Sequence, residues 1–297
     1  MSEEKLTFEY CDNMVRKFEE VIEKPIVNGS SVYYTGVDLG TACVVLAVLD
    51  ENYNPVAGAY RYADVVRDGM VVDYIGAVRI VRELKEEIEE KLNTELIYAA
   101  AAIPPGTDAL DSGAIKNVVQ SAGFELTCLL DEPTAANAVL KIQNGAVVDI
   151  GGGTTGISIL KDGKVVYVVD EPTGGTHFSL VISGAYEMPF NKADEYKRDN
   201  KNHKEILPVL KPVVEKVSSI INNHIKNYDV NEISLVGGTC CLTGIEEIIE
   251  KQTGVYTHKP RNPMFVTPLG IALSCTRDII ESVSYTHLRA HETLANL

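Results

Sequence analysis

One pattern occurs twice in this sequence and limits the folds that are open to it. Val32–Asp38 and Ala42–Asp50 are apolar, β-branched runs separated only by a short turn that contains glycine. Ala146–Ile150 and Thr155–Leu160 repeat this pattern around a run of glycines. Such runs joined by tight glycine turns predict β-hairpins. A chain that builds the same hairpin twice is predicted to be an internal duplication.

The segments after each hairpin support this duplication, because strands and helices follow in a similar order. After the first hairpin, the patterns predict strands over Val56–Arg61, Leu96–Ile103 and Phe124–Leu130, and helices over Ile75–Leu92, 108–122 and Pro133–Gln143. After the second hairpin, they predict strands over Val165–Val169 and Ile233–Val236, and helices over 176–186, 204–226, Ile245–Lys251 and Thr267–Ile280. Apolar residues at helical spacing, such as Val78, Val81 and Leu84, support the helix predictions. The predicted fold class is therefore α/β, with two lobes of one design.

An amphipathic helix precedes the duplicated part. Apolar side chains recur at helical spacing from Cys11 to Ile22, and Pro25 follows them. This helix either packs on the domain behind it or docks onto a partner. Residues 284–297 lose all periodicity, and we interpret them as a non-native tail. The predicted units are an N-terminal helix and linker (1–28), lobe I (29–148), lobe II (149–262) and a C-terminal helix (263–281) that packs back on lobe I.

Charge and composition exclude several classes of function. The 297 residues are 45% hydrophobic and 23% charged, and the formal net charge is −15. A field of this sign repels polyanions, so neither nucleic acid nor an anionic membrane is an expected partner. No apolar run approaches the roughly 18 residues of a membrane span, and the N-terminus lacks the order of a signal peptide. The six cysteines show no metal-binding spacing. The composition thus predicts a cytoplasmic protein with reduced thiols.

The glycines of the second hairpin match a dinucleotide-binding motif, but in the wrong context. Gly151–Gly156 satisfies G-x-G-x-x-G and follows a strand, whereas Ile157–Leu160 continues as another strand. The dinucleotide site needs a helix N-terminus at this point, so this interpretation fails. A P-loop motif, G-x-x-x-x-G-K-[ST], is also absent from the sequence.

An aspartate beside each glycine turn suggests a different anion site. Asp38 precedes the first turn and Asp149 the second. Glycine turns leave backbone N–H groups open to an anion, with no Cβ in the way. Each aspartate can hold Mg²⁺ through water, because this ion keeps several waters when it bridges phosphates. Two such turns that face each other would clamp a triphosphate from both sides.

Five segments, in order, resemble the actin/Hsp70/sugar-kinase ATPase superfamily. They are two phosphate loops (Val37–Thr41 and Asp149–Thr155), two connecting segments (Asp131–Ala136 and Pro268–Ala272) and an adenosine segment (Leu235–Thr239). The resemblance implies a duplicated ribonuclease-H-like (actin-like ATPase) fold, with two lobes around a nucleotide cleft. The stretches 61–95 and 186–232 are short for this superfamily, so the outer subdomains are expected to be minimal. Within it, Arg67–Tyr74 and Gly174–Phe178 resemble the EutJ family, chaperone-like proteins of ethanolamine utilisation.

The resemblance also implies roles for individual residues. ATP or ADP with Mg²⁺ would be the cofactors, and Asp38 and Asp149 would surround the metal ion. Glu132 would orient or deprotonate the attacking water, with Asp149 as the second catalytic residue. Contacts to the nucleotide would come from Asp38 and from the glycine-rich segments: Gly40, Thr41, Gly151, Gly152, Gly153, Thr154, Gly174, Gly175, Gly237, Gly238 and Thr239.

Two residues depart from the Hsp70 pattern. His177 stands where Hsp70 proteins have Asp, and Cys241 stands where they have an Arg against the adenine. We therefore expect slow hydrolysis or none, and a modest affinity for adenine. The resemblance favours an ATP-driven switch that engages a protein client or an enzyme of ethanolamine metabolism, in the cytoplasm or at a bacterial microcompartment. An actin-like polymerising protein, a small-molecule kinase of the same fold and a non-hydrolysing binding module stay open as alternatives.

Overall fold

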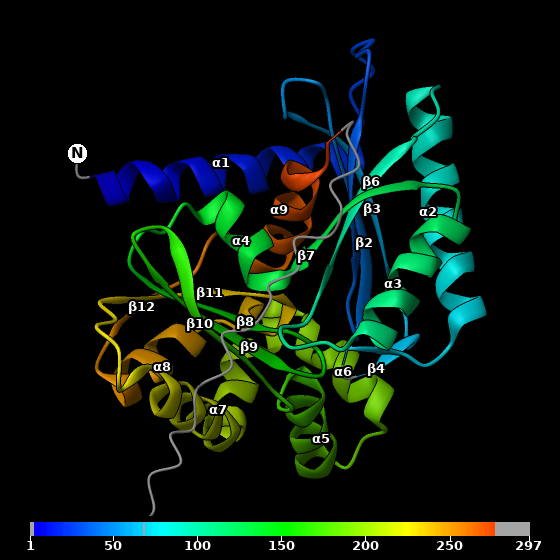
Figure 1. Cartoon of the computed structure of the whole chain (residues 1–297). Helices are drawn as coiled ribbons and strands as arrows, with labels where there is room; N and C mark the ends of the chain where they lie inside the picture. Colours follow the sequence, from blue (N-terminus) through cyan, green and yellow to red (C-terminus); the bar gives the residue numbers. More distant parts are fainter. Residues whose placement is uncertain (1–2, 68, 277–297) are drawn as a thin grey trace, which may run out of the picture.

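Two five-stranded sheets with the same strand order form the centre of the molecule, one in each half of the chain (Figure 1). The computed structural model describes residues 3–67 and 69–276. The first sheet has the order β3 (Pro55–Tyr62), β2 (Cys43–Leu49), β1 (Tyr34–Leu39), β6 (Tyr98–Ile103), β7 (Glu125–Asp131). The second has the order β10 (Lys164–Glu171), β9 (Thr155–Lys161), β8 (Gly145–Ile150), β11 (Glu232–Val236), β12 (Tyr256–His258). The predicted duplication is present in the topology.

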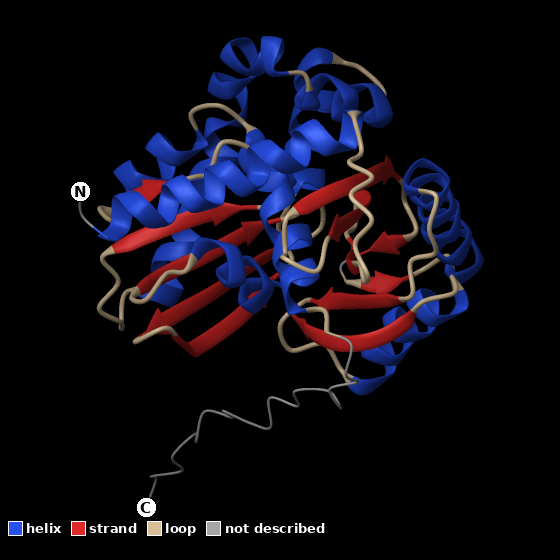
Figure 2. Ribbon diagram, turned by 90° about the horizontal axis from the view of Figure 1, so that it is seen from above, coloured by secondary structure: helices blue, strands red, loops and turns tan. Residues whose placement is uncertain are grey.

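Each sheet combines an antiparallel meander with parallel strands. β1 pairs antiparallel with β2 and parallel with β6, and β8 pairs in the same way with β9 and β11. The central strands are buried along almost their whole length, because both faces are covered. Their β-branched runs suit such a position. The strands fall into two separate groups in the view of Figure 2.

Helices cover the outer face of each sheet. α2 (Tyr74–Leu92) and α3 (Ala109–Ser121) pack on the first sheet. The second sheet is covered by α5 (Gly175–Tyr186), α6 (Phe190–Arg198), α7 (His203–Ile225) and α8 (Ile245–Thr253). Shorter elements are the pair β4 (Val66–Arg67) and β5 (Met70–Val71) and the 3₁₀ turns Asn200–Asn202, Gly238–Cys241 and Pro263–Phe265. None of the helices in the described ranges is long and apolar enough to cross a bilayer.

Two further helices cross between the lobes. α4 (Glu132–Leu140) follows the first sheet but packs on β8 and β9 of the second. α9 (Val266–Ser274) follows the second sheet but packs on β1 and β2 of the first. The two helices meet where Gly270 lies against the Ala135 carbonyl, and a Cβ at Gly270 would overlap that oxygen. Each lobe is therefore completed by the helix that follows the other lobe.

The N-terminal helix α1 (Glu3–Glu23) lies across α4 and α9 and reaches the edge strand β3 (Figure 1). Cys11, Val15 and Phe18 on its apolar face are fully buried. This burial decides between the two alternatives for the helix: it packs on the body of the protein rather than presenting a free apolar face.

The structure differs from the sequence predictions in a few elements. α6, β12 and the short pair β4–β5 have no counterpart among the predicted elements. The helix predicted over Pro133–Gln143 ends at Leu140, because Lys141 adopts a left-handed conformation with φ 60°. The helix predicted over Thr267–Ile280 ends at Ser274, where Cys275 becomes extended. The rest of that prediction and the interpretation of residues 284–297 lie outside the described residues.

Candidate nucleotide site

A cavity of about 880 Å³ lies between the two lobes, and residues of both line it. Most of the residues that the sequence analysis assigned to the site come together on its wall. They are Asp38, Gly40, Thr41, Glu132, Asp149, Gly151, Gly152, Gly153, Thr154, Gly237, Gly238 and Thr239. The sequence separates these residues by up to two hundred positions, and the repeated topology brings them to one place.

The two glycine turns face each other across this cavity. A Cβ built at Gly152 would lie 2.9 Å from the Ala42 Cβ and 3.3 Å from the Thr41 Cβ. Each turn is closed by one backbone hydrogen bond, from Gly40 N–H to the Cys43 carbonyl (3.1 Å) and from Gly151 N–H to the Thr154 carbonyl (3.0 Å). The absence of side chains at Gly152 is what lets the turns approach so closely.

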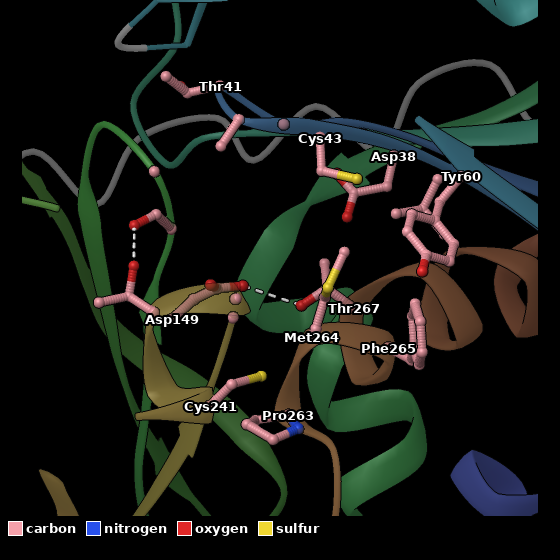
Figure 3. A pocket seen from close by; sticks show the side chains of 18 of the residues that line it. Asp38, Thr41, Cys43, Tyr60, Asp149, Cys241, Pro263, Met264, Phe265 and Thr267 are labelled. Atoms are coloured by element: carbon pink, nitrogen blue, oxygen red, sulfur yellow. Dashed lines mark hydrogen bonds between the residues drawn. The ribbon is translucent and has the colours of Figure 1, made fainter. Parts of the chain in front are cut away.

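Three carboxylates border the same cavity, and Figure 3 labels two of them, Asp38 and Asp149. Asp38 lies near the end of β1, Asp149 near the end of β8, and Glu132 at the first position of α4. The Thr267 hydroxyl donates to Asp149 Oδ2 at 2.8 Å, which holds this carboxylate toward the centre of the site. Asp149 is only 8% exposed.

The environment of these carboxylates disfavours their charged forms. Burial and the negative charge of Asp149 raise the pKa of Asp38 to about 7. Burial raises the pKa of Asp149 to about 6, against the opposing effect of the Thr267 hydrogen bond. Burial, and then repulsion from Asp149 and Asp38, raise the pKa of Glu132 well above its usual range. A site of this kind is short of positive charge, so its chemistry fits a bound cation.

A hydrated cation fits this geometry better than a cation that is chelated directly by side chains. Within residues 3–67 and 69–276, no group of three His, Cys, Asp or Glu side chains is arranged to hold a metal ion directly. Mg²⁺ commonly binds through one or two carboxylates, waters and phosphate oxygens. The chemistry of Asp38 and Asp149 suits such an ion without a full ligand set from the protein, and binding of Mg²⁺ by these residues stays a prediction.

The segment after β11 abuts the second turn. Gly237 has φ +90°, and a Cβ there would overlap Asp149 Oδ1 and the Ile150 carbonyl. The Thr239 hydroxyl donates to the Gly151 carbonyl at 2.7 Å. Cys241 also lines the cavity, and its thiol contacts Asn262 Oδ1 at 3.5 Å. This wall is where the resemblance predicts the adenosine.

Gly174 and Gly175 do not line the cavity but lie one layer behind the second turn. Gly175 N–H donates to the Gly151 carbonyl (2.9 Å) and Thr176 N–H to the Gly152 carbonyl (2.8 Å). The turn therefore caps the N-terminus of α5, whose first donors have no partner within the helix. His177 Nδ1 accepts from Gly174 N–H at 3.4 Å, and His177 also stays out of the cavity lining. Direct contact of Gly174 and Gly175 with nucleotide stays a prediction.

The sequence analysis missed the part of the wall that comes from α6. Lys197 Nζ donates to the Gly175 carbonyl, the Ser179 hydroxyl and Asp194 Oδ1, each within 3.0 Å. Arg198 lies 3.9 Å above the ring of Tyr62, which belongs to the opposite lobe. The only signal in the sequence is the acid–base spacing along the helix, an i, i+3 pair that a polar surface helix also shows.

Comparison with known proteins identifies the class to which this architecture belongs. The family model of the type IV pilus assembly protein PilM matches residues 130–265, and that of the MreB/Mbl protein matches residues 57–188. The structure of MreB5 of Spiroplasma citri bound to ADP superimposes with a TM-score of 0.66 at 19% identity, over 82% of this chain and 96% of that one. The fold is thus that of the actin-like ATPases, as predicted.

More similar proteins identify the family within this class. The ethanolamine utilization protein EutJ of Salmonella typhimurium strain LT2 is 46% identical over 242 residues, which is 81% of this chain and 85% of that protein. The crystal structure of EutJ from Carboxydothermus hydrogenoformans matches with a TM-score of 0.86 and 48% identity, over 90% of this chain and 99% of that one. The chain belongs to the EutJ family of ethanolamine utilization proteins, as the sequence resemblance indicated.

Proposed function

We propose that the chain is an ATP-driven conformational switch of ethanolamine utilisation. ATP and Mg²⁺ bind between the lobes, and occupancy of the cavity sets the angle between them. The observation that carries this proposal is the approach of Gly152 to Thr41 and Ala42, which sets two glycine turns face to face beside three carboxylates. That a solved relative of the same fold, MreB5, is bound to ADP supports the choice of ligand.

The residues of the site divide the work. Backbone N–H groups at Thr41 and at 152–154 donate to phosphate oxygens, whereas those of Gly40 and Gly151 close their own turns. Asp38 and Asp149 hold Mg²⁺, which neutralises phosphate charge when it is bound. Glu132 orients the attacking water and takes its proton. The glycines of the second wall, Gly237 and Gly238, leave room for the ribose and the base.

The switch acts on another protein. The relatives are named for ethanolamine utilisation, so the client is a protein or enzyme of ethanolamine metabolism, and the setting is the cytoplasm or a bacterial microcompartment. The task is chaperone-like or reactivating, and the turnover is slow. Cys241 in place of the stacking Arg keeps the affinity for adenine modest.

The test combines isothermal titration with ATP and Mg²⁺ and phosphate release over hours. We expect binding and slow release in the wild type, and Glu132→Gln should reduce release by about 100-fold or more while binding persists. Glu86→Gln, an exposed change on α2, is the matched control and should change neither. Absence of binding at millimolar ATP would overturn the proposal, and loss of binding in Glu132→Gln would make that residue structural rather than catalytic.

The same samples separate the alternatives. Release of ADP that requires an added acceptor molecule would indicate a small-molecule kinase. A rise in light scattering on addition of ATP would indicate an actin-like polymerising protein.

A further inference from the structure

The helix α1 is attached to both lobes of the molecule. On lobe I, Phe18 packs so closely on Gly58 of β3 that a Cβ at that glycine would overlap the ring. Just after the helix, Ile26 N–H donates to the Val56 carbonyl of the same strand at 2.8 Å. These contacts fix the C-terminal half of α1 to the edge of the first sheet.

The other attachment is to lobe II and to the segment that leaves it for α9. The ring of Phe8 lies 4.0 Å from that of His258 at the end of β12. Asp12 Oδ1 accepts from Arg261 N–H at 2.8 Å. Glu19 accepts from Asn262 Nδ2 at 2.8 Å and from Arg261 Nε at 3.3 Å. The helix therefore spans the two lobes. Its apolar face is buried along its length, and its polar side chains Asp12 and Glu19 contact the segment that follows β12.

Glu19 also connects α1 to the cavity. Its side chain is one of those that line the space between the lobes, together with Asn262 and Cys241. Asn262 joins the other two, because its amide donates to Glu19 and its Oδ1 accepts from the Cys241 thiol. A hydrogen-bonded chain thus runs from the wall that follows Gly238 to the N-terminal helix.

We infer that α1 is a cross-lobe strap and that Glu19 is its positioning residue, which couples occupancy of the cavity to the angle between the lobes. The identity of the ligand in this inference rests on the proposed function. The strap itself rests on contacts that do not depend on a ligand.

The coupling follows from the stiffness of a helix. A helix of 21 residues is a rod about 30 Å long and does not stretch when the lobes rotate. A change in lobe angle must therefore break one set of contacts. The polar set at Asp12 and Glu19 breaks first, since the Arg261 side chain is 63% exposed whereas Phe18 is fully buried. A ligand that holds Asn262 in place keeps the polar contacts of Asp12 and Glu19 intact. When these contacts are lost, the ligand is released.

The test uses the full-length protein and three variants of α1. Glu19→Ala removes the acceptor, and Glu19→Gln keeps an oxygen for the Asn262 amide. Glu20→Ala is the matched control, because among the described residues Glu20 forms its ion pair with Arg16 on the same helix and does not line the cavity. Dissociation of a fluorescent ATP analogue with Mg²⁺ is followed by stopped flow. Amide hydrogen exchange of residues 256–264 is measured without nucleotide.

Glu19→Ala should speed dissociation of the analogue about fivefold or more and speed exchange over residues 256–264. In Glu19→Gln both rates should return most of the way to their wild-type values, and Glu20→Ala should match the wild type. If Glu19→Ala and Glu20→Ala behave alike in both measurements, the strap is overturned. If exchange changes while a bound analogue leaves at the wild-type rate, the coupling is overturned. If the wild type binds no nucleotide, the proposed function fails, and hydrogen exchange alone decides whether the strap exists.

Discussion

The two lobes share one strand order but build opposite walls of the cavity. Among the described residues that line it, lobe I contributes Asp38 and Glu132 and no Lys or Arg. Lobe II contributes the carboxylates Asp149, Asp194 and Asp199 together with the cationic side chains Lys197, Arg198, Lys259 and Arg261. The two lobes therefore share one topology but place different charged side chains at the cavity.

The cations of lobe II do not compensate the carboxylates of lobe I. Lys197 is occupied by the Gly175 carbonyl, Ser179 and Asp194. Lys259 is occupied by the Leu242 carbonyl and by Glu246. These two lysines stabilise the structure of their own lobe and do not pair with Asp38, Asp149 or Glu132. The comparison shows that one lobe can use its positive charges to stabilise its own structure, while carboxylates of both lobes border the cavity.

The largest effect is expected where the two halves are joined. Gly270→Ala places a methyl group into the Ala135 carbonyl and should lower the free energy of unfolding by about 3 kcal/mol or more. Gly113→Ala in α3 is the matched control, because its Cβ would meet open space and should add about 1 kcal/mol of stability. Urea denaturation measures both. Equal effects of the two changes would show that the crossing of α4 and α9 is not tightly packed.

A second prediction concerns the negative charges of Asp38 and Asp149. The pKa values of Asp38 and Asp149, about 7 and about 6, lie above the ordinary value of 3.8. The folded state therefore binds more protons than the unfolded state between about pH 4 and pH 7, and stability without Mg²⁺ should fall as the pH rises through this window. Asp38→Asn should flatten the decline and stabilise the protein at pH 8, by on the order of 2 kcal/mol after allowance for solvent screening.

Denaturation curves at several pH values, recorded in the presence of a chelator, check this prediction. Asp229→Asn, an exposed change far along the chain, should leave the pH dependence as it is. Stability that does not change between pH 4 and pH 7, or a destabilised Asp38→Asn variant at pH 8, would contradict the raised pKa values of these aspartates.

The smallest effect distinguishes the two aspartates. Thr267 donates to Asp149 and lowers its pKa, a contribution that the pKa of Asp38 lacks. Thr267→Val should raise the pKa of Asp149 and cost about 1–2 kcal/mol of stability at pH 8, less at pH 5. Thr267→Ser keeps the hydroxyl and should resemble the wild type. NMR titration of the aspartate carboxyls measures the shift, and an unchanged titration of Asp149 would remove this difference between the lobes.

The fold could be predicted largely from local patterns. The hairpins were recognised because β-branched runs flank glycine turns, and α2 because one apolar stripe runs along it. α6 was missed because only Ala193 among its residues is buried, so it shows no stripe. The contact of Gly270 with Ala135 could not be predicted, since a small residue in a helix does not reveal which neighbour it must admit.

The site was predictable where its residues are part of a sequence motif. Asp38, Asp149 and Glu132 adjoin glycine turns or a helix start, and the structure brings them together. Lys197, Thr267 and Glu19 reach the cavity only through tertiary packing of helices that are far apart in the sequence. The placement of Gly174 and Gly175 behind the turn depends on how α5 enters the lobe, which a motif does not specify.

The exchange of helices between the lobes has a consequence for synthesis of the chain. The face of the first sheet that carries Tyr34, Val45 and Leu49 is covered by Leu269 and Ile271 of α9, near the end of the described chain. A ribosome makes the strands of this sheet first and the helix that covers them last. The apolar face of the first sheet therefore stays uncovered until residues 266–274 have been made.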